Sequence, residues 1–202
     1  GAPELLPAFV RDPAASHDQP RTVFLRPPTG PSGTGPVSYA LLRDRSPRLG
    51  DADLPPDPRQ VAVVDRAVAD LAGGLGQQAA TELAHAGIRY VLLPLANDGG
   101  LGSRIAGAGG LLPKTTDSGW QVWQVEGNAG RLAIAVPHQD NWQLASTGGA
   151  IGRRSEPITV PYAPMARLLV LAEAPSPQWR AVIVGSARKS PVPLASTTAE
   201  GM

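Results

Sequence analysis

The stretch QQAATELAHAGIRYVLLP, residues 77–94, decides the fold of this chain because a helix signal passes directly into a strand signal. Residues 77–86 predict a helix, and Gly87 follows at the position where a helix commonly ends on a left-handed glycine. Residues 88–94 are almost wholly apolar, which is typical of a strand buried on both faces in the middle of a sheet. The stretch therefore predicts a helix packed on a sheet whose central strand follows it.

A second helix is predicted upstream, in LPPDPRQVAVVDRAVADLAGG. Asp57 is a fitting N-cap, and Pro58 suits the first helical position because its missing N–H is not needed there. Apolar residues then recur at spacings of three and four until two glycines stop the run; they are Val61, Val64, Val68 and Leu71.

Two short strands are predicted before this helix, in RTVFLRP (21–27) and VSYALLR (37–43). The proline- and glycine-rich residues between them indicate a loop, so the pair predicts a hairpin with a long tip. Residues 1–20 carry four prolines and no sustained period, which indicates an irregular arm.

Downstream of the central strand, the glycine-rich residues 97–110 predict a loop that holds one short helix. Strand-like LLPKTT follows, and then WQVWQVE (120–126), in which Trp120 and Val122 share one face while Trp123 and Val125 share the other. The remaining residues form short β-like pieces at intervals of about ten residues, a spacing typical of a small sandwich; the pieces are RLAIAVP, WQLAS, EPITVPY, ARLLVLAEA, WRAVIVG and SPVPLAS.

These patterns predict an α+β protein, with an α/β part in which a helix pair lies on a small sheet, followed by a β-rich, sandwich-like part. The predicted organisation is an arm over residues 1–20, an α/β subdomain over 21–127 and a β-rich subdomain over 128–202. Within the second subdomain, Leu169–Leu171 and Ala181–Val184 are predicted to pair with each other as core strands.

The composition narrows the classes of function. A net charge of +1 over 202 residues argues against a nucleic-acid partner, which would require a concentrated basic face. The absence of cysteine excludes disulfides and thiolate chemistry, and three widely separated histidines form no metal-binding motif. No apolar run reaches the roughly 18 residues of a membrane span. The chain begins and ends abruptly, so we expect it to be a piece of a longer protein.

Motifs that resemble catalytic sites have simpler interpretations. Asp51 and Asp53 have the spacing of a metal-binding DxD pair, but they lie in a proline-rich approach to a helix, where aspartate favours turns. Residues 97–110 match no phosphate-binding motif, and Ser16-His17-Asp18 are consecutive, unlike a catalytic triad. Glu82 and His85, one helical turn apart, are predicted to make a solvent contact. We therefore predict no catalytic residue, no metal and no cofactor.

Tryptophan is the remaining candidate for a binding site, because its face can stack on a sugar ring. Trp120 and Trp123 are predicted to pack in the core. Trp142 and Trp179 each begin a strand after a polar turn, and Arg180 beside Trp179 carries donors for hydroxyl groups. Packing is the favoured interpretation for both, with ligand binding by Trp142, Trp179 and Arg180 as the alternative.

Several stretches together resemble the C-terminal domain of large, multi-pass actinobacterial membrane proteins of the glycosyltransferase family 2 type; they are RTVFLRP, VSYALLRDRSPRLGDADLPP, VAVVDRAVADLAGG, AATELAHAGIRYVLLP, GWQVWQVEG and LVLAEAPSPQWRAVIVG. In such proteins the catalytic domain is cytosolic and precedes the membrane helices, and the tail domain is expected outside. The resemblance implies a location at the cell membrane on the extracytoplasmic side. It brings no catalytic residue to this chain.

Two functions follow as expectations. The first is a non-catalytic extracytoplasmic domain of a membrane glycosyltransferase-like protein that binds or positions cell-envelope polysaccharide. The second is a structural or protein-interaction module that packs on the membrane helices of its parent or on another envelope protein. An aromatic groove would favour the first, and an exposed apolar patch would favour the second.

Overall fold

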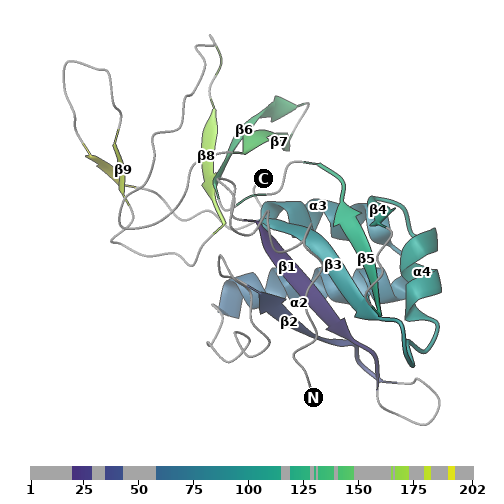
Figure 1. Ribbon diagram of the computed structural model, residues 1–202. Coiled ribbons are helices and arrows are strands. Elements are labelled where there is room, and N and C mark those ends of the chain that lie inside the picture. Colours follow the sequence, from purple (N-terminus) through teal and green to yellow (C-terminus); the bar gives the residue numbers. More distant parts are fainter. Residues whose placement is uncertain are drawn as a thin grey trace.

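The computed structural model of the chain describes residues 20–28, 35–42, 58–114, 119–127, 130, 132–138, 141–147, 165, 167–172, 180–182 and 191–193. The strands form three sheets, of five, three and two strands (Figure 1). All strands of the first sheet precede Gly127, and the other strands follow Gly130. None of the helices among these residues is long and apolar enough to span a membrane.

The five-stranded sheet is built around β3 (Ile88–Pro94), the predicted central strand. β1 pairs with β3 in parallel, whereas β5 pairs with its other edge antiparallel. β2 and β4 complete the sheet as antiparallel neighbours of β1 and β5. The predicted hairpin and the predicted strands 88–94 and 120–126 are thus confirmed; the bounds are Arg21–Arg26 for β1, Ser38–Leu42 for β2, Leu111–Lys114 for β4 and Trp120–Val125 for β5.

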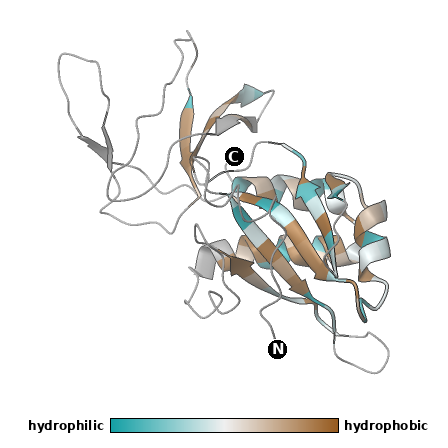
Figure 2. Ribbon diagram, in the orientation of Figure 1, coloured by the Kyte–Doolittle hydropathy of each residue, from teal (hydrophilic) through white to brown (hydrophobic). Residues whose placement is uncertain are grey.

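Both predicted helices are present, α2 over Pro58–Gly73 and α3 over Gly76–His85, and the short α4 spans Leu101–Gly107. α2 starts at the proline expected to open it; Asp57, the expected cap, lies outside the described residues. The apolar stripe of α2 packs with α3 on one face of the sheet, and Figure 1 shows both helices behind the strands. The main core lies between these layers, and Figure 2 shows the central strands as its most hydrophobic part.

The opposite face of the five-stranded sheet carries a second, smaller cluster made only of strand residues; they are Phe24, Ala40, Tyr90, Leu92, Trp120 and Val122. The rings of Phe24 and Trp120 meet edge to face, with centroids 4.9 Å apart and planes at 70°. The alternation predicted for β5 is confirmed, because Trp120 and Val122 belong to this cluster whereas Trp123 and Val125 belong to the main core.

The turn between α3 and β3 is fixed by a buried arginine. Arg21, only 1% exposed, donates from Nη1 to the carbonyl oxygen of Ala86 at 3.0 Å, and its backbone N–H donates to the Gly87 carbonyl at 2.8 Å. Ala86 caps the C-terminus of α3, where the aligned peptide dipoles favour a positive charge. Gly87 has a φ of +72°, as the predicted helix-ending glycine requires.

The second region contains β6 (Leu132–His138), β7 (Asn141–Thr147) and β8 (Leu168–Leu171), with β6 in the middle of an antiparallel sheet. β9 (Arg180–Val182) and β10 (Pro191–Pro193) form a separate antiparallel pair. The predicted pairing of Leu169–Leu171 with Ala181–Val184 is therefore wrong. β8 pairs with β6, in a register that places Leu169 opposite Ile134. β9 pairs with β10, the next strand in the chain.

The two regions meet at Gly87. A Cβ atom placed on Gly87 would lie 2.8 Å from the carbonyl oxygen of Gly130 and 3.1 Å from the Cβ atom of Ala172, which follows β8. Leu144 of β7 also packs against the main core. The fold is thus α+β, with a helix pair on a small sheet followed by a strand-rich region, as the sequence predicts.

Candidate interaction surface

The residues predicted to bind a ligand belong to two different sheets. Trp142 lies on β7, where its backbone is paired opposite Pro137 of β6. Arg180 opens β9, opposite Pro193 of β10. Trp179 and the side chains of Trp142 and Arg180 lie outside the described residues. A sugar-binding role for these three residues remains a prediction.

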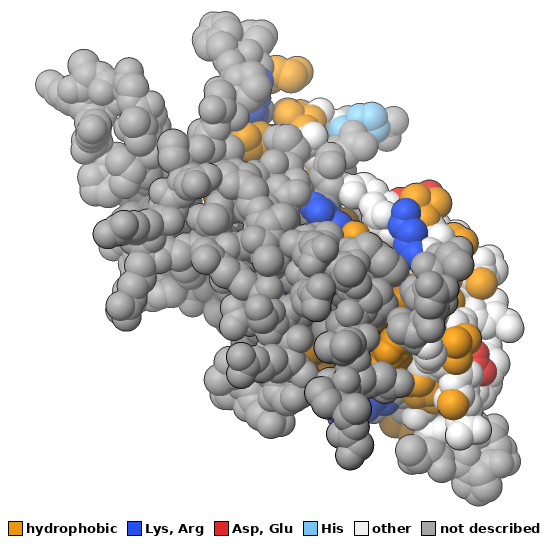
Figure 3. Space-filling view, in the orientation of Figure 1, with side chains coloured by type: hydrophobic (Ala, Val, Ile, Leu, Met, Phe, Trp, Pro, Cys, Tyr) orange, Lys and Arg blue, Asp and Glu red, His pale blue; other side chains and the backbone are white. Residues whose placement is uncertain are grey.

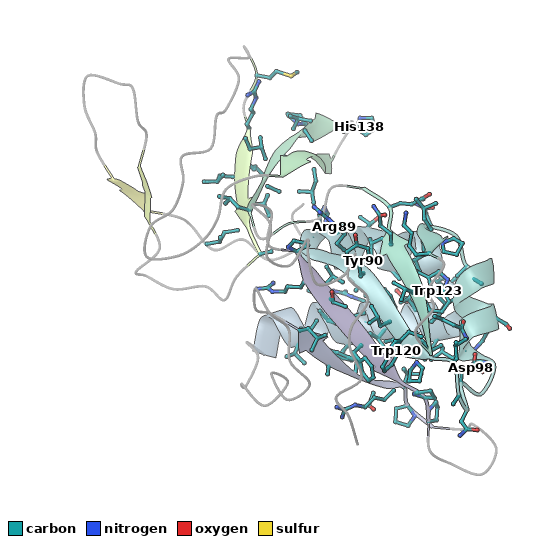
Figure 4. The ribbon with its side chains drawn as sticks, viewed as in Figure 1. Arg89, Tyr90, Asp98, Trp120, Trp123 and His138 are labelled. Atoms are coloured by element: carbon teal, nitrogen blue, oxygen red, sulfur yellow. The ribbon has the colours of Figure 1, made fainter. Side chains whose placement is uncertain are left out.

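The other two tryptophans pack in the first region, as predicted. Trp120 is 6% exposed and Trp123 is 3% exposed. Figure 4 shows both within the five-stranded sheet, from which they project to opposite faces. Neither ring therefore offers a stacking platform to a sugar.

A polar turn closes the end of β3, within the glycine-rich stretch. Oδ1 of Asp98 accepts a hydrogen bond from the Gly100 N–H at 2.9 Å, and Oδ2 accepts from the Gly102 N–H at 3.1 Å and from Nε2 of Gln121 at 3.2 Å. The Gly100 N–H contributes most to lowering the pKa of Asp98 below its usual value. Because both oxygens are engaged within the chain, this carboxylate braces the turn.

A cluster of charged residues joins α2 to α3. Nε of Arg66 lies 3.0 Å from Oε1 of Glu82, while Oε2 of Glu82 and Oδ2 of Asp70 are buried without a hydrogen-bond partner. Burial raises the pKa of Glu82, Arg66 lowers it, and Asp70 raises it. Burial also lowers the pKa of His85.

The predicted solvent contact between Glu82 and His85 is therefore wrong, because Glu82 turns toward α2 and pairs with Arg66. The prediction considered α3 alone and left out the helix packed against it. In the described part of the chain, no group of three or more histidine, aspartate or glutamate side chains is arranged to hold a metal ion.

β8 is unusual because it is wholly apolar and yet is left partly open to solvent. Leu169 is 39% exposed, and the other three residues of the strand are half-buried. Met165, just before the strand, is 59% exposed. Figure 3 shows apolar side chains at the surface near the top of the view, in the region of β6 and β8.

β8 is also an edge strand. One of its edges pairs with β6, and within the described residues no strand pairs with the other. β4, an edge of the first sheet, carries Pro113 and Lys114, residue types that discourage pairing with another chain. The four residues of β8 include neither proline nor charge. β8 is thus an apolar, partly exposed edge strand of the kind to which another strand can be added.

The sequence prediction missed this surface because an unbroken apolar run predicts a strand buried on both faces. β3 and β8 share this apolar pattern. The pattern does not indicate which of the two strands lies at the centre of a sheet and which lies at its edge.

Comparison with known proteins gives no relative for this chain: no family model, no curated protein and no solved structure matches it.

Proposed function

We propose that this chain is a non-catalytic interaction module of a larger envelope protein of the type its sequence resembles, located on the extracytoplasmic side of the membrane. The observation that supports this function is the apolar edge strand β8, with Leu169 exposed by 39%. An apolar strand with one open edge gains stability when another strand adds main-chain hydrogen bonds and covers its side chains.

The polar groups of the first region are consistent with a supporting role. The carboxylate of Asp98 holds a turn, Glu82 pairs with Arg66 across two helices, and Oη of Tyr39 donates to Asp65 at 2.8 Å between β2 and α2. Each of these contacts ties one element of the fold to another. The first region is thus a scaffold that presents the second.

The test is site-specific photocrosslinking in cells that express the full-length parent. A crosslinker at Leu169 is expected to capture a defined polypeptide, either the parent itself or one envelope protein. A crosslinker at Leu112 is the matched control, because Leu112 is 44% exposed on the blunted edge strand β4. Equal yields from the two positions, or no product from Leu169, would contradict the proposal.

A second candidate function is the binding or positioning of envelope polysaccharide. The observation that favours it is the position of Trp142 near the start of β7, next to Asn141, which pairs with the exposed His138 of β6. Addition of cell-wall oligosaccharides should then change the tryptophan fluorescence, and Trp142→Ala should remove the change while Leu169→Ala keeps it. An unchanged spectrum at saturating oligosaccharide would rule this function out.

A further inference from the structure

We propose that residues 5–10 of this chain, LLPAFV, bind across the face of the five-stranded sheet that lies away from the helices. We call it the aromatic face; its side chains are those of Phe24, Ala40, Tyr90, Leu92, Trp120 and Val122. The contact lies in the first region and does not depend on the function proposed for β8.

Burial shows that the aromatic face is covered. Leu92 of the central strand is 0% exposed, and Val122 of β5 is 2% exposed. The side chains of a sheet stand roughly perpendicular to it, so neighbours on the same face shield their flanks and leave their tips open. Complete burial in the middle of the face therefore requires a layer of atoms above it.

The described elements do not supply this layer. The helices α2, α3 and α4 all contribute buried side chains to the main core, and none of them contributes to the cluster on the aromatic face. Figure 1 shows α2 and α3 behind the strands. Leu144 of the second region also packs against the main core. The cover therefore comes from residues outside the described ranges.

Exposure along one row of paired residues locates the cover. Each of the five strands contributes one residue to this row on the aromatic face; from β2 to β4 they are Leu42, Thr22, Tyr90, Gln124 and Leu112. Leu42, Thr22 and Tyr90 are 4%, 2% and 7% exposed, whereas Leu112 is 44% exposed. The cover thus lies over β2, β1 and β3 and ends before β4.

Composition selects residues 5–10 as the occupant. Three undescribed stretches connect the strands and α2 of the first region, and all are polar; they are TGPSGT (29–34), RDRSPRLGDADLPPD (43–57) and TTDS (115–118). The fourth stretch, residues 1–19, leads into β1 and contains the uncharged run LLPAFV. Because burial of apolar surface is favourable, this run is the one that matches an apolar face.

The connection to β1 is long enough for this contact. Residues 11–19 separate the run from Pro20, which is buried and directly precedes β1. Nine extended residues span up to about 30 Å, whereas neighbouring strands lie about 4.7–4.9 Å apart. The run can therefore reach each of the covered strands.

The first experiment labels the tryptophans of the whole chain with fluorotryptophan for fluorine NMR. Trp120 and Trp123 lie on the same strand and are 6% and 3% exposed, but Trp120 belongs to the aromatic face and Trp123 to the main core. Phe9→Glu places a charge in the apolar run and should displace it. The Trp120 resonance should then shift and become several-fold more sensitive to a soluble paramagnetic agent, while the Trp123 resonance stays unchanged.

Leu54→Glu is the matched control, because it adds the same charge to the competing stretch 43–57. It should leave both resonances in place. A Trp120 resonance that responds to Leu54→Glu and not to Phe9→Glu would assign the cover to residues 43–57 and overturn the proposal. A Trp120 resonance that responds to neither variant would overturn it as well.

A second experiment keeps an aromatic ring in the run, so it does not depend on how well the charged variant folds. A photoreactive benzophenone side chain in place of Phe9 should form crosslinks within one chain to peptides of β1, β3 or β5, identified by mass spectrometry. Products with the mass of two chains would assign the face to a second copy. Those products, or crosslinks confined to other elements, would contradict the proposal.

Discussion

Two apolar strands with similar sequences have opposite positions in this molecule. β3 (IRYVLLP) is the centre of the five-stranded sheet, and Val91, Leu92 and Leu93 are fully buried. β8 (LLVL) is the outer strand of the three-stranded sheet, and each of its side chains is half-buried or exposed. β3 has a paired strand on each side and a helix layer over one face, whereas β8 pairs only with β6 among the described residues.

The difference shows that an apolar run indicates a strand that is to be buried. It does not indicate whether the same chain or another chain covers that strand. The helices that precede β3 in the sequence cover it, and strands on both sides pair with it. No strand within the described residues pairs with the outer edge of β8, and its side chains are exposed or half-buried.

The largest expected effect is the loss of stability on alanine substitution in β3, compared with the same substitution in β8. Leu93→Ala should reduce the free energy of unfolding by about 2–5 kcal/mol because it leaves a cavity in the main core. Leu169→Ala should cost about 0.5 kcal/mol or less, because this side chain is already 39% exposed. Urea denaturation followed by circular dichroism, at concentrations where the chain is monomeric, measures both. Equal losses would show that β8 is an interior strand.

The next expected effect concerns the contact between the two regions. Gly74→Ala and Gly87→Ala both force alanine into a left-handed conformation, with φ of +85° and +72°, which costs about 1–2 kcal/mol. Gly74 has open space around its Cα, whereas a Cβ on Gly87 would meet the Gly130 carbonyl. Gly87→Ala should therefore be the more destabilising in thermal unfolding. Equal shifts in Tm would mean that the regions are not in close contact at this turn.

A smaller effect is expected at the polar turn after β3. Asp98→Asn should lower the free energy of unfolding by about 1 kcal/mol at neutral pH, because the Gly100 and Gly102 N–H groups lose a charged acceptor. The lowered pKa of Asp98 means that its contribution is present above the unfolded value of 3.8 and is lost as the pH falls through the folded value. The two unfolding curves should thus converge in acid. A constant difference would contradict this.

The smallest expected effect is the pH dependence contributed by Glu82 and His85, which both lie on α3. Since the pKa of Glu82 is raised, its contribution to stability is complete below 4.5 and is lost as the pH rises through the folded value. His85, with a lowered pKa, contributes above 6.5 and loses this as the pH falls through its folded value. Glu82→Gln should remove the decrease in the free energy of unfolding that Glu82 causes as the pH rises, measured by urea denaturation at a series of pH values. A pH profile identical to that of the unmodified chain would contradict the assignment.

The fold of the first region could be predicted because each of its signals is local. Pro58 opens one helix and Gly87 ends another, and the strand predicted over 88–94 is observed with the same bounds. In the second region every described strand overlaps a predicted stretch, and the predicted stretch EPITVPY lies outside the described residues. The partner predicted for β8 was wrong. Which strands pair depends on contacts between residues far apart in sequence. The alternation of apolar residues within one strand does not identify its partner.

The candidate surface was harder to predict than the fold. Tryptophan is the residue type with the most obvious binding chemistry in this sequence, yet Trp120 and Trp123 are core residues. The edge of β8 has no distinctive residue, and its only signal is that neither proline nor charge interrupts the strand. The Arg66–Glu82 contact was missed for a related reason, because it joins two helices and appears in neither helix alone.

The bond from Arg21 to Ala86 also has a kinetic consequence. It joins residues 65 apart in sequence, at the point where β1 and β3 begin their parallel pairing. Closing so long a loop carries an entropic cost before the strands are paired, and contacts distant in sequence slow folding. The helix pair and the β4–β5 pair involve neighbouring segments, so we expect them to form early. Docking of β1 beside β3 is then the step that sets the folding rate of the first region.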